Sequence, residues 1–236
     1  MTVEICVDSI ESAFIAEKSG ANRIELCSGL ALGGLTPSWG LIEKAVKELS
    51  INIHVLVRAR GGDFTYSKNE IDIMIADIEM ARSLGVQGIV SGVLNKDQTI
   101  DIENTEKLMQ ACADLPFTFH RAFDWIYKKE NALAQLDKLG VQRVLTSGGS
   151  LNAIDAINIL ASWDKNFNTT ILPGGRINSS NYKAFKTVGF EEIHLSAAEI
   201  IDNGANKISL NTPKYMVENG YISCNKNEVS SICRGI

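Results

Sequence analysis

Short runs in which apolar and polar residues alternate recur along the chain, and stretches with helical spacing separate them. Four of the helical stretches end at a glycine, and a β-rich run begins two or three residues later; these glycines are Gly20, Gly85, Gly140 and Gly189. Glycine readily adopts the left-handed conformation that ends a helix. The chain is therefore predicted to repeat one unit, a strand followed by a helix.

The pattern predicts eight strands, at residues 3–7, 23–26, 51–57, 88–91, 116–120, 143–146, 170–172 and 192–195. Helices are expected at 9–18, 38–49, 69–84, 104–113, 129–139, 153–163 and 180–188, the third with the capping-box spacing of Ser67 and Glu70. Eight such repeats predict an α/β protein with a single-domain (β/α)8 TIM barrel. A doubly wound sheet is the alternative, but such a sheet usually has fewer strands.

We expect the barrel to span residues 1–202 and residues 203–236 to form a C-terminal extension. The extension is rich in Asn and Lys and shows no clear periodicity, so it is expected to pack on the barrel or on a partner chain.

The predicted strands carry polar residues along one face. Successive side chains of a strand point to opposite faces. Because the apolar faces must meet the helices, the polar faces should line the barrel interior, called the lumen below. The residues placed there include Glu4, Cys6, Arg23, Glu25, Cys27, His54, Arg58, His120 and His194.

Buried charges need partners, and this set allows two interpretations. Glu4 and Arg23 suit an internal salt-bridge network that holds the barrel together. Residues nearer the carboxyl ends of the strands favour a functional role, because the active sites of such barrels lie at that end. They are Cys27, Arg58, His120 and His194.

Two predicted loops carry candidate ligand-binding groups. Arg58, Arg60 and Asp63 follow the third strand together with two glycines, and arginines beside open backbone N–H groups suit a carboxylate or phosphate. The alternative is a structural turn in which Asp63 pairs with an arginine.

The loop after the fifth strand offers His120, Arg121 and Asp124 as an acid–base group. The alternative there is a helix start that Asp124 caps. Glycine-rich turns at 146–150 and 173–176 suit a phosphate or, equally, tight turns into helices.

The cysteines include one pair in the same phase on neighbouring strands, Cys6 and Cys27. Two facing thiols suit a soft metal such as Cu(I). The alternative is a pair of small buried apolar side chains. Five cysteines in 236 residues do not suggest a disulfide framework.

Composition and charge limit the classes of binding partner and the cellular compartment. A net charge of −5 and the lack of a basic run argue against nucleic acid as a partner. No apolar run is long enough to span a bilayer, and acidic residues interrupt the start of the chain where a signal peptide would lie. We expect a cytoplasmic protein that does not contact a membrane.

Several stretches, in order along residues 3–200, resemble the CutC copper homeostasis protein family. They are Glu-Ile-Cys-Val-Asp-Ser (4–9), Arg-Ile-Glu-Leu-Cys (23–27), Gly-Gly-Leu-Thr-Pro-Ser (33–38), Arg-Ala-Arg-Gly-Gly-Asp-Phe (58–64) with Tyr-Ser (66–67), Phe-His-Arg-Ala-Phe-Asp (119–124) and Leu-Thr-Ser-Gly (145–148).

The resemblance implies a cytoplasmic barrel that forms a homo-oligomer (dimer or tetramer) and handles copper, with Cys6 and Cys27 as ligands of Cu(I). The chain departs from the family pattern in three places. It has Ala59 where proline is usual and Leu195 where some members carry another cysteine, and its tail is shorter and divergent.

Three functions compete at this point. The first is Cu(I) binding through Cys6 and Cys27, which leaves the charged loops unexplained. The second is an enzyme acting on a small anionic, phosphorylated or carboxylated substrate. In that enzyme Glu25, His120 or Asp124 would move a proton, and the substrate-binding residues would be Arg58, Arg60, Asp63, Arg121 and His194. A non-catalytic scaffold is the third, and the convergent charges fit it poorly.

Overall fold

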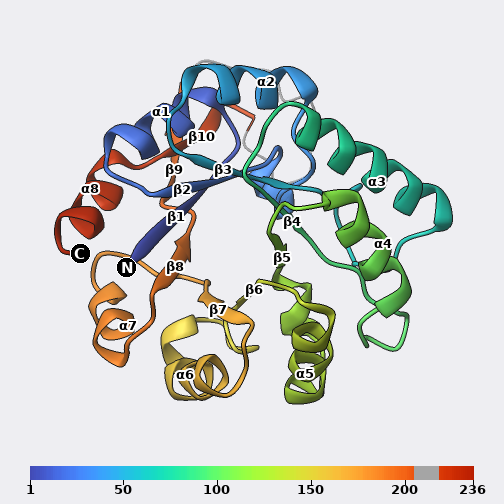
Figure 1. Cartoon of the computed structure of the whole chain (residues 1–236). Helices are drawn as coiled ribbons and strands as arrows, with labels where there is room; N and C mark the ends of the chain where they lie inside the picture. Colours follow the sequence, from blue (N-terminus) through green and yellow to red (C-terminus); the bar gives the residue numbers. More distant parts are fainter. Residues whose placement is uncertain (205–217) are drawn as a thin grey trace.

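The structure, a computed structural model, describes residues 1–204 and 218–236. In these two ranges eight parallel strands form one sheet in the order β7-β6-β5-β4-β3-β2-β1-β8, and a bridge between Gly174 and His194 joins its two edges into a barrel (Figure 1). The strands are β1 (Thr2–Val7), β2 (Arg23–Leu26), β3 (Asn52–Leu56), β4 (Gly88–Ser91), β5 (Phe117–Phe119), β6 (Arg143–Thr146), β7 (Thr170–Pro173) and β8 (Glu192–Leu195). The predicted TIM barrel is confirmed. The cyclic strand order rules out the doubly wound sheet.

Helices surround the barrel, as Figure 1 shows. They are α1 (Ile10–Lys18), α2 (Trp39–Glu48), α3 (Lys68–Ser83), α4 (Ile102–Cys112), α5 (Lys129–Leu139), α6 (Ile157–Asn166) and α7 (Tyr182–Val188). Ser67 and Glu70 form the predicted capping box of α3. All four glycines of the repeated junction have a positive φ, between 79° and 107°. The helix expected at 153–163 begins instead as a 3-10 turn (Ala153–Ala156) before α6.

The described part of the C-terminal extension contributes a hairpin strand and a helix. Strand β9 (Ala198–Asp202) pairs antiparallel with β10 (Gly220–Cys224), and α8 (Lys226–Arg234) follows. The N–H of Cys224 donates to Ser12 Oγ on α1 at 3.1 Å, so the hairpin lies against the first helix. Residues 205–217 of the predicted extension lie outside the described residues. The sequence pattern did not reveal the hairpin.

The sheet separates an apolar core from a polar lumen. Val3, Ile5 and Ile24 point to the helices and are at most 1% exposed. The alternate residues Glu4 and Glu25 are also buried, at 1% and 4% exposed, but they face the lumen, as their phase predicted.

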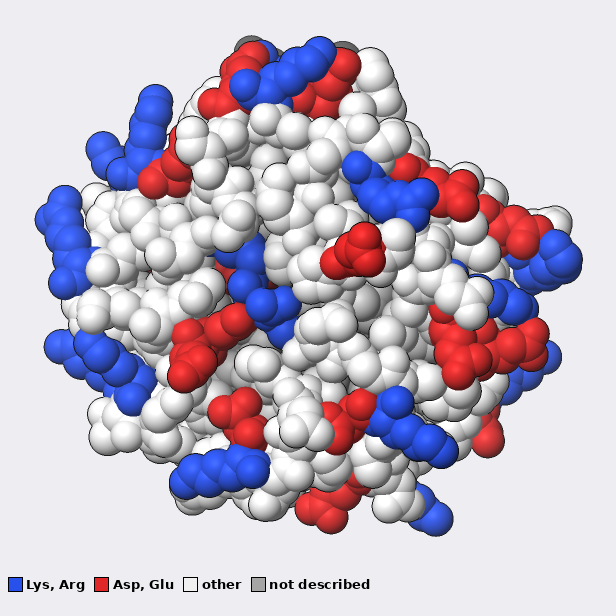
Figure 2. Space-filling model, in the orientation of Figure 1, with Lys and Arg blue, Asp and Glu red and all other residues white. Residues whose placement is uncertain are grey.

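The surface shows no dominant sign of charge on the face drawn in Figure 2, where acidic and basic side chains are interspersed. A small group of basic side chains lies in the hollow near its middle. No helix among the described residues is long and apolar enough to cross a membrane.

Candidate metal and ligand centre in the lumen

A salt-bridge network occupies the part of the lumen nearest the strand starts. Arg23 binds both Glu4 and Glu192, and Arg143 Nε donates to Glu192 Oε2 at 2.9 Å. These side chains are no more than 20% exposed. Glu4 and Arg23 therefore do pair with each other, which agrees with the structural interpretation of these two residues.

His194 joins this network to the middle of the lumen. Its Nδ1 lies 2.7 Å from Glu4 Oε1 and 3.4 Å from Glu25 Oε2. His54 lies on the other side of Glu4, with its Nδ1 3.9 Å from Glu4 Oε2. Two acidic and two imidazole side chains thus share one buried space.

The protonation of these four groups follows from burial and from their neighbours. Burial works to raise the pKa of Glu4, but the hydrogen bond with His194 and the charge of Arg23 outweigh it and hold this pKa below its usual range. Burial raises the pKa of Glu25 to about 7 and lowers that of His54 to about 4. Burial also opposes the charge on His194, but the hydrogen bond to Glu4 and the charge of Glu25 raise its pKa.

The thiols of Cys6 and Cys27 lie directly above this group. Their Sγ atoms are 3.7 Å apart and both residues are buried, in an apolar surrounding of Leu56, Val90 and Leu30. Cys6 lies opposite Glu25 in the register, and Cys27 follows Glu25 by two residues, directly after the end of β2. The phase argument placed the two thiols on the same face, and they are in contact.

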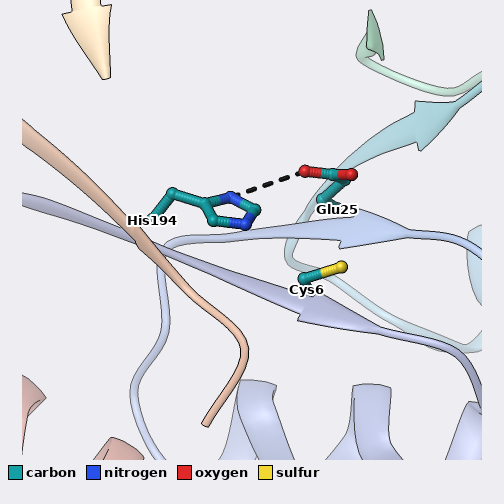
Figure 3. Close-up of side chains that lie close together, drawn as sticks. All are labelled: Cys6, Glu25 and His194. Atoms are coloured by element: carbon teal, nitrogen blue, oxygen red, sulfur yellow. Dashed lines mark ion pairs between the residues drawn. The ribbon is translucent and has the colours of Figure 1, made fainter. Parts of the chain in front are cut away.

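Cys6, Glu25 and His194 converge on one point from β1, β2 and β8 (Figure 3). One potential ligand atom from each lies within 4.8 Å of those from the other two. The hydrogen bond with Cys27, burial and the charge of Glu25 all raise the pKa of the Cys6 thiol. The cluster thus offers one sulfur, an imidazole and a carboxylate to a single ion, with the Sγ of Cys27 3.7 Å from that of Cys6, although the sequence suggested only the two thiols.

Arg58 and Arg60 have different surroundings at the mouth of the barrel. Arg58 is 5% exposed and donates to the carbonyls of Leu32, Gly34 and Gly62. Its guanidinium therefore ties the loop after β2 to the loop after β3.

Arg60 stabilises its own loop. It pairs with Asp63 at 2.9 Å and with Glu70 at 2.6 Å, and it also donates to the carbonyls of Gly61, Asp63 and Thr65. This is the arrangement of the structural-turn alternative, in which Asp63 pairs with an arginine.

The fifth loop separates His120 from the other two residues that the sequence grouped there. His120 is 5% exposed, and its Nδ1 accepts the N–H of Ala122 at 3.3 Å, so His120 and not Asp124 caps the 3-10 turn Arg121–Trp125. Arg121 pairs with Asp124 at 2.8 Å and reaches Ser147 Oγ at 2.9 Å. No contact between His120 and Asp124 is present among the described residues.

Asp124 fills the glycine-rich turn after β6. Its Oδ1 accepts from Thr146 Oγ1 at 2.5 Å, from the N–H of Ser147 at 3.1 Å and from the N–H of Gly149 at 3.0 Å. Backbone donors in the loops after the seventh and eighth strands hold phosphate in many barrels, and the glycine-rich turn after β6 offers similar donors. Here they hold a carboxylate of the same chain.

Two aromatic residues that sequence reasoning did not single out complete the mouth. The ring of Phe64 lies 4.8 Å from that of His120 and 4.7 Å from the guanidinium carbon of Arg58, and Trp125 packs on it at 4.9 Å. Tyr66 lies under Arg60. Phe64 and Tyr66 follow Arg60 by four and six residues, and this position in the loop was the available signal.

Fold and lumen together define a (β/α)8-barrel protein whose interior carries charged groups and a thiol pair in place of the usual apolar layers. Residues 1–199 match the model of the CutC family. The chain belongs to the CutC family, as its sequence motifs suggested.

Named relatives agree with this assignment. The chain is 43% identical to the human copper homeostasis protein cutC homolog, over 86% of this chain and 75% of that protein. It is 44% identical to a CutC family protein of Pasteurella multocida (strain Pm70), over 83% of this chain and 82% of that protein.

Solved structures show the same fold. The crystal structure of the CutC protein of Streptococcus agalactiae matches with a TM-score of 0.78 at 33% identity, over 83% of this chain and 98% of that one. An aldolase matches with a TM-score of 0.61 at 11% identity, over 82% of this chain and 89% of that one, which supports the barrel fold alone.

Proposed function

We propose that the protein is a cytoplasmic, homo-oligomeric copper homeostasis protein that binds Cu(I) directly through Cys6 and Cys27. The observation that carries the proposal is the separation of 3.7 Å between the two Sγ atoms. Metal–thiolate bonds of about 2.3 Å, as in zinc sites, place two sulfurs about 3.8 Å apart at a tetrahedral angle. One ion can therefore bridge the pair with almost no movement of the strands.

The chemistry of the surrounding groups favours a soft monovalent ion. Thiolates select Cu(I), and imidazole suits copper as well, whereas carboxylates prefer harder ions. His194 Nδ1 is held by Glu4, a pairing that typically orients a metal-binding histidine and leaves its other nitrogen free to act as the ligand. Cys6, Cys27 and His194 are thus the preferred donor set for Cu(I), and Glu25 lies beside it.

Binding must release protons, since thiolates and not thiols bind metals. The raised pKa of Cys6 means that its thiol carries a proton at neutral pH in the metal-free protein. Glu25, whose pKa is about 7, lies near enough to take up a proton that the thiols lose.

Titration of the reduced protein with Cu(I) against a competing chelator tests the proposal. We expect one ion per chain, bound at least about 100-fold more weakly by Cys6→Ser and by Cys27→Ser, because each substitution removes a thiolate ligand. Cys112→Ser is the matched control, because Cys112 is also buried but lies on α4 and bonds the carbonyl of Leu108. Parent binding no tighter than that of the two variants would overturn the proposal.

A second candidate function is catalysis on a small anionic substrate, with Glu25, His120 or Asp124 moving a proton. It is favoured by Glu25, because a buried carboxyl with a pKa of about 7 matches what a general base needs at neutral pH. Turnover of a carboxylated or phosphorylated compound that is lost in Glu25→Gln, with Cu(I) binding retained, would establish it.

A further inference from the structure

Three buried polar atoms at the mouth of the barrel have no hydrogen-bond partner in the described part of the chain. They are Arg58 Nε, Tyr66 Oη and His120 Nε2. Buried polar atoms of native proteins are nearly always paired, and an unpaired one is destabilising. Three such atoms in one region indicate that a bound molecule supplies the missing partners.

The three groups belong to one small region. Phe64 contacts two of them, the guanidinium of Arg58 and the ring of His120. Arg58 also lies close to Tyr66: its charge and a weak hydrogen-bond interaction with it act against the burial that raises the pKa of the Tyr66 hydroxyl. The region is held in place by the bonds of Arg58 to three loop carbonyls.

All three atoms are donors. His120 Nδ1 accepts a backbone N–H, so in the neutral ring the proton is on Nε2. The ring stays neutral because burial and the charge of Arg58 lower its pKa to about 3. The Tyr66 hydroxyl keeps its proton at neutral pH, and Arg58 is always charged. A single positive charge with three unpaired N–H and O–H groups around Phe64 is complementary to an anion that only accepts hydrogen bonds.

We propose that Arg58, Tyr66 and His120 form a binding site for the carboxylate of a small organic acid at the mouth of the barrel. A carboxylate has one negative charge and two acceptor oxygens, which match one guanidinium and two neutral donors. The half-buried ring of Phe64 lies between this site and the exposed Trp125, so it forms the apolar wall next to the carboxylate.

Phosphate fits this mouth less well on two counts. A phosphate ester dianion would carry one more charge than the single buried cation can balance. The glycine-rich turn after β6, the other candidate for holding phosphate, already has its donors bound to Asp124. The molecule recognised here is thus a carboxylic acid, and the site is separate from the thiol pair.

Nitrogen-15 spectra of the histidine side chains give a direct test, because the chain has only three histidines. His54→Gln and His120→Gln assign the resonances. The probes are acetate, its neutral isostere acetamide and inorganic phosphate, each at constant ionic strength. We expect acetate to shift the His120 Nε2 resonance in a saturable way, with little or no response to the other two.

Two variants then examine the donors. Arg58→Lys and Tyr66→Phe should each weaken acetate binding about tenfold or more, since each loses a hydrogen bond to a charged group. Tyr221→Phe, in the exposed part of β10, should leave binding unchanged, and thermal unfolding of each variant checks that it is folded. An unshifted His120 resonance, an equal shift with acetamide, or unchanged binding in both donor variants would overturn the proposal.

Discussion

His194 Nδ1 and Glu4 Oε1 lie 2.7 Å apart inside the barrel, where β8 pairs with β1. The two residues are 190 positions apart in the chain, and they face each other in the register of the two strands. Their hydrogen bond therefore joins the first strand of the barrel to its eighth strand. Through Glu4 it also connects the salt-bridge network at the strand starts to the thiols at the other end of the lumen.

The stability of the fold should depend on the proton held by Glu25. The folded pKa is about 7 against an ordinary value of 4.5, so between these values the folded protein binds a proton that the unfolded chain does not. The free energy of unfolding then falls as pH rises, by about 1.4 kcal/mol per pH unit from this group alone.

Glu25→Gln removes that dependence. We expect urea unfolding curves between pH 4.5 and 7 to show a clearly smaller loss of stability in Glu25→Gln than in the parent. His194, whose pKa is raised, acts in the same direction: its contribution is complete below pH 6.5 and is lost as pH rises through its folded pKa. Parallel curves for parent and variant would contradict the assignment to Glu25.

Removing the charge of Glu192 should strongly destabilise the barrel. Glu192→Gln leaves Arg23 and Arg143 in a buried site without their shared carboxylate, which we expect to lower the free energy of unfolding by about 2–4 kcal/mol. Glu48→Gln is the control, because Glu48 pairs with Lys44 on the exposed surface of α2. That change should be within about 0.5 kcal/mol of the parent. Equal effects of the two substitutions in chemical denaturation would show that the network is not stabilising.

Because Gly88 has no side chain, it leaves room for the His54 ring in the lumen. A Cβ at this position would lie 2.6 Å from two atoms of the ring, so Gly88→Ala should lower the free energy of unfolding by about 1–3 kcal/mol. In contrast, Gly40 lies in α2 with nothing within 4 Å of an added Cβ, and Gly40→Ala should raise stability by about 0.5–1 kcal/mol. The cost at Gly88 should shrink in a His54→Ala background; a cost that stays the same would rule out the contact as its cause.

Asp124 should keep phosphate out of the turn after β6. Asp124→Ala frees the N–H groups of Ser147 and Gly149, which then resemble an anion-binding turn. We expect inorganic phosphate to raise the melting temperature of this variant and not that of the parent, because a ligand that binds only the folded state stabilises it. Sodium chloride at the same ionic strength is the control. A parent that responds as strongly as the variant would contradict this role.

Alternation along the strands was enough to predict which residues line the lumen. Glu4, Glu25 and His194 lie where their phase placed them, because a strand must turn every second side chain to the same side. The glycines that end the helices could also be predicted, because the left-handed conformation at a helix end favours glycine whatever the rest of the fold.

The hydrogen-bond and ion-pair partners of the polar side chains could not be predicted from the sequence, because they depend on distances between elements. The sequence offered the pairing of Asp63 with an arginine only as one alternative. Nothing local shows that Glu70 is a second partner of Arg60, or that Asp124 binds a turn 22 to 25 residues further along the chain. The stagger of the barrel, which sets Cys6 opposite Glu25, also lies outside a single-strand pattern.

The apolar covering of the thiols has a kinetic consequence. Leu30 packs over Cys6, Cys27, Leu56 and Val90, and its backbone N–H is held by the Asp8 carboxylate at 3.2 Å. Arg58 holds the same loop through the carbonyls of Leu32 and Gly34. Because Cys6 and Cys27 are at most 7% exposed, we expect an ion to reach the two sulfurs only when this segment moves aside. The time that an ion stays bound would then depend on how often the loop opens. Substitutions in the loop would change the rate of ion exchange, whereas substitutions of the ligands would change the affinity.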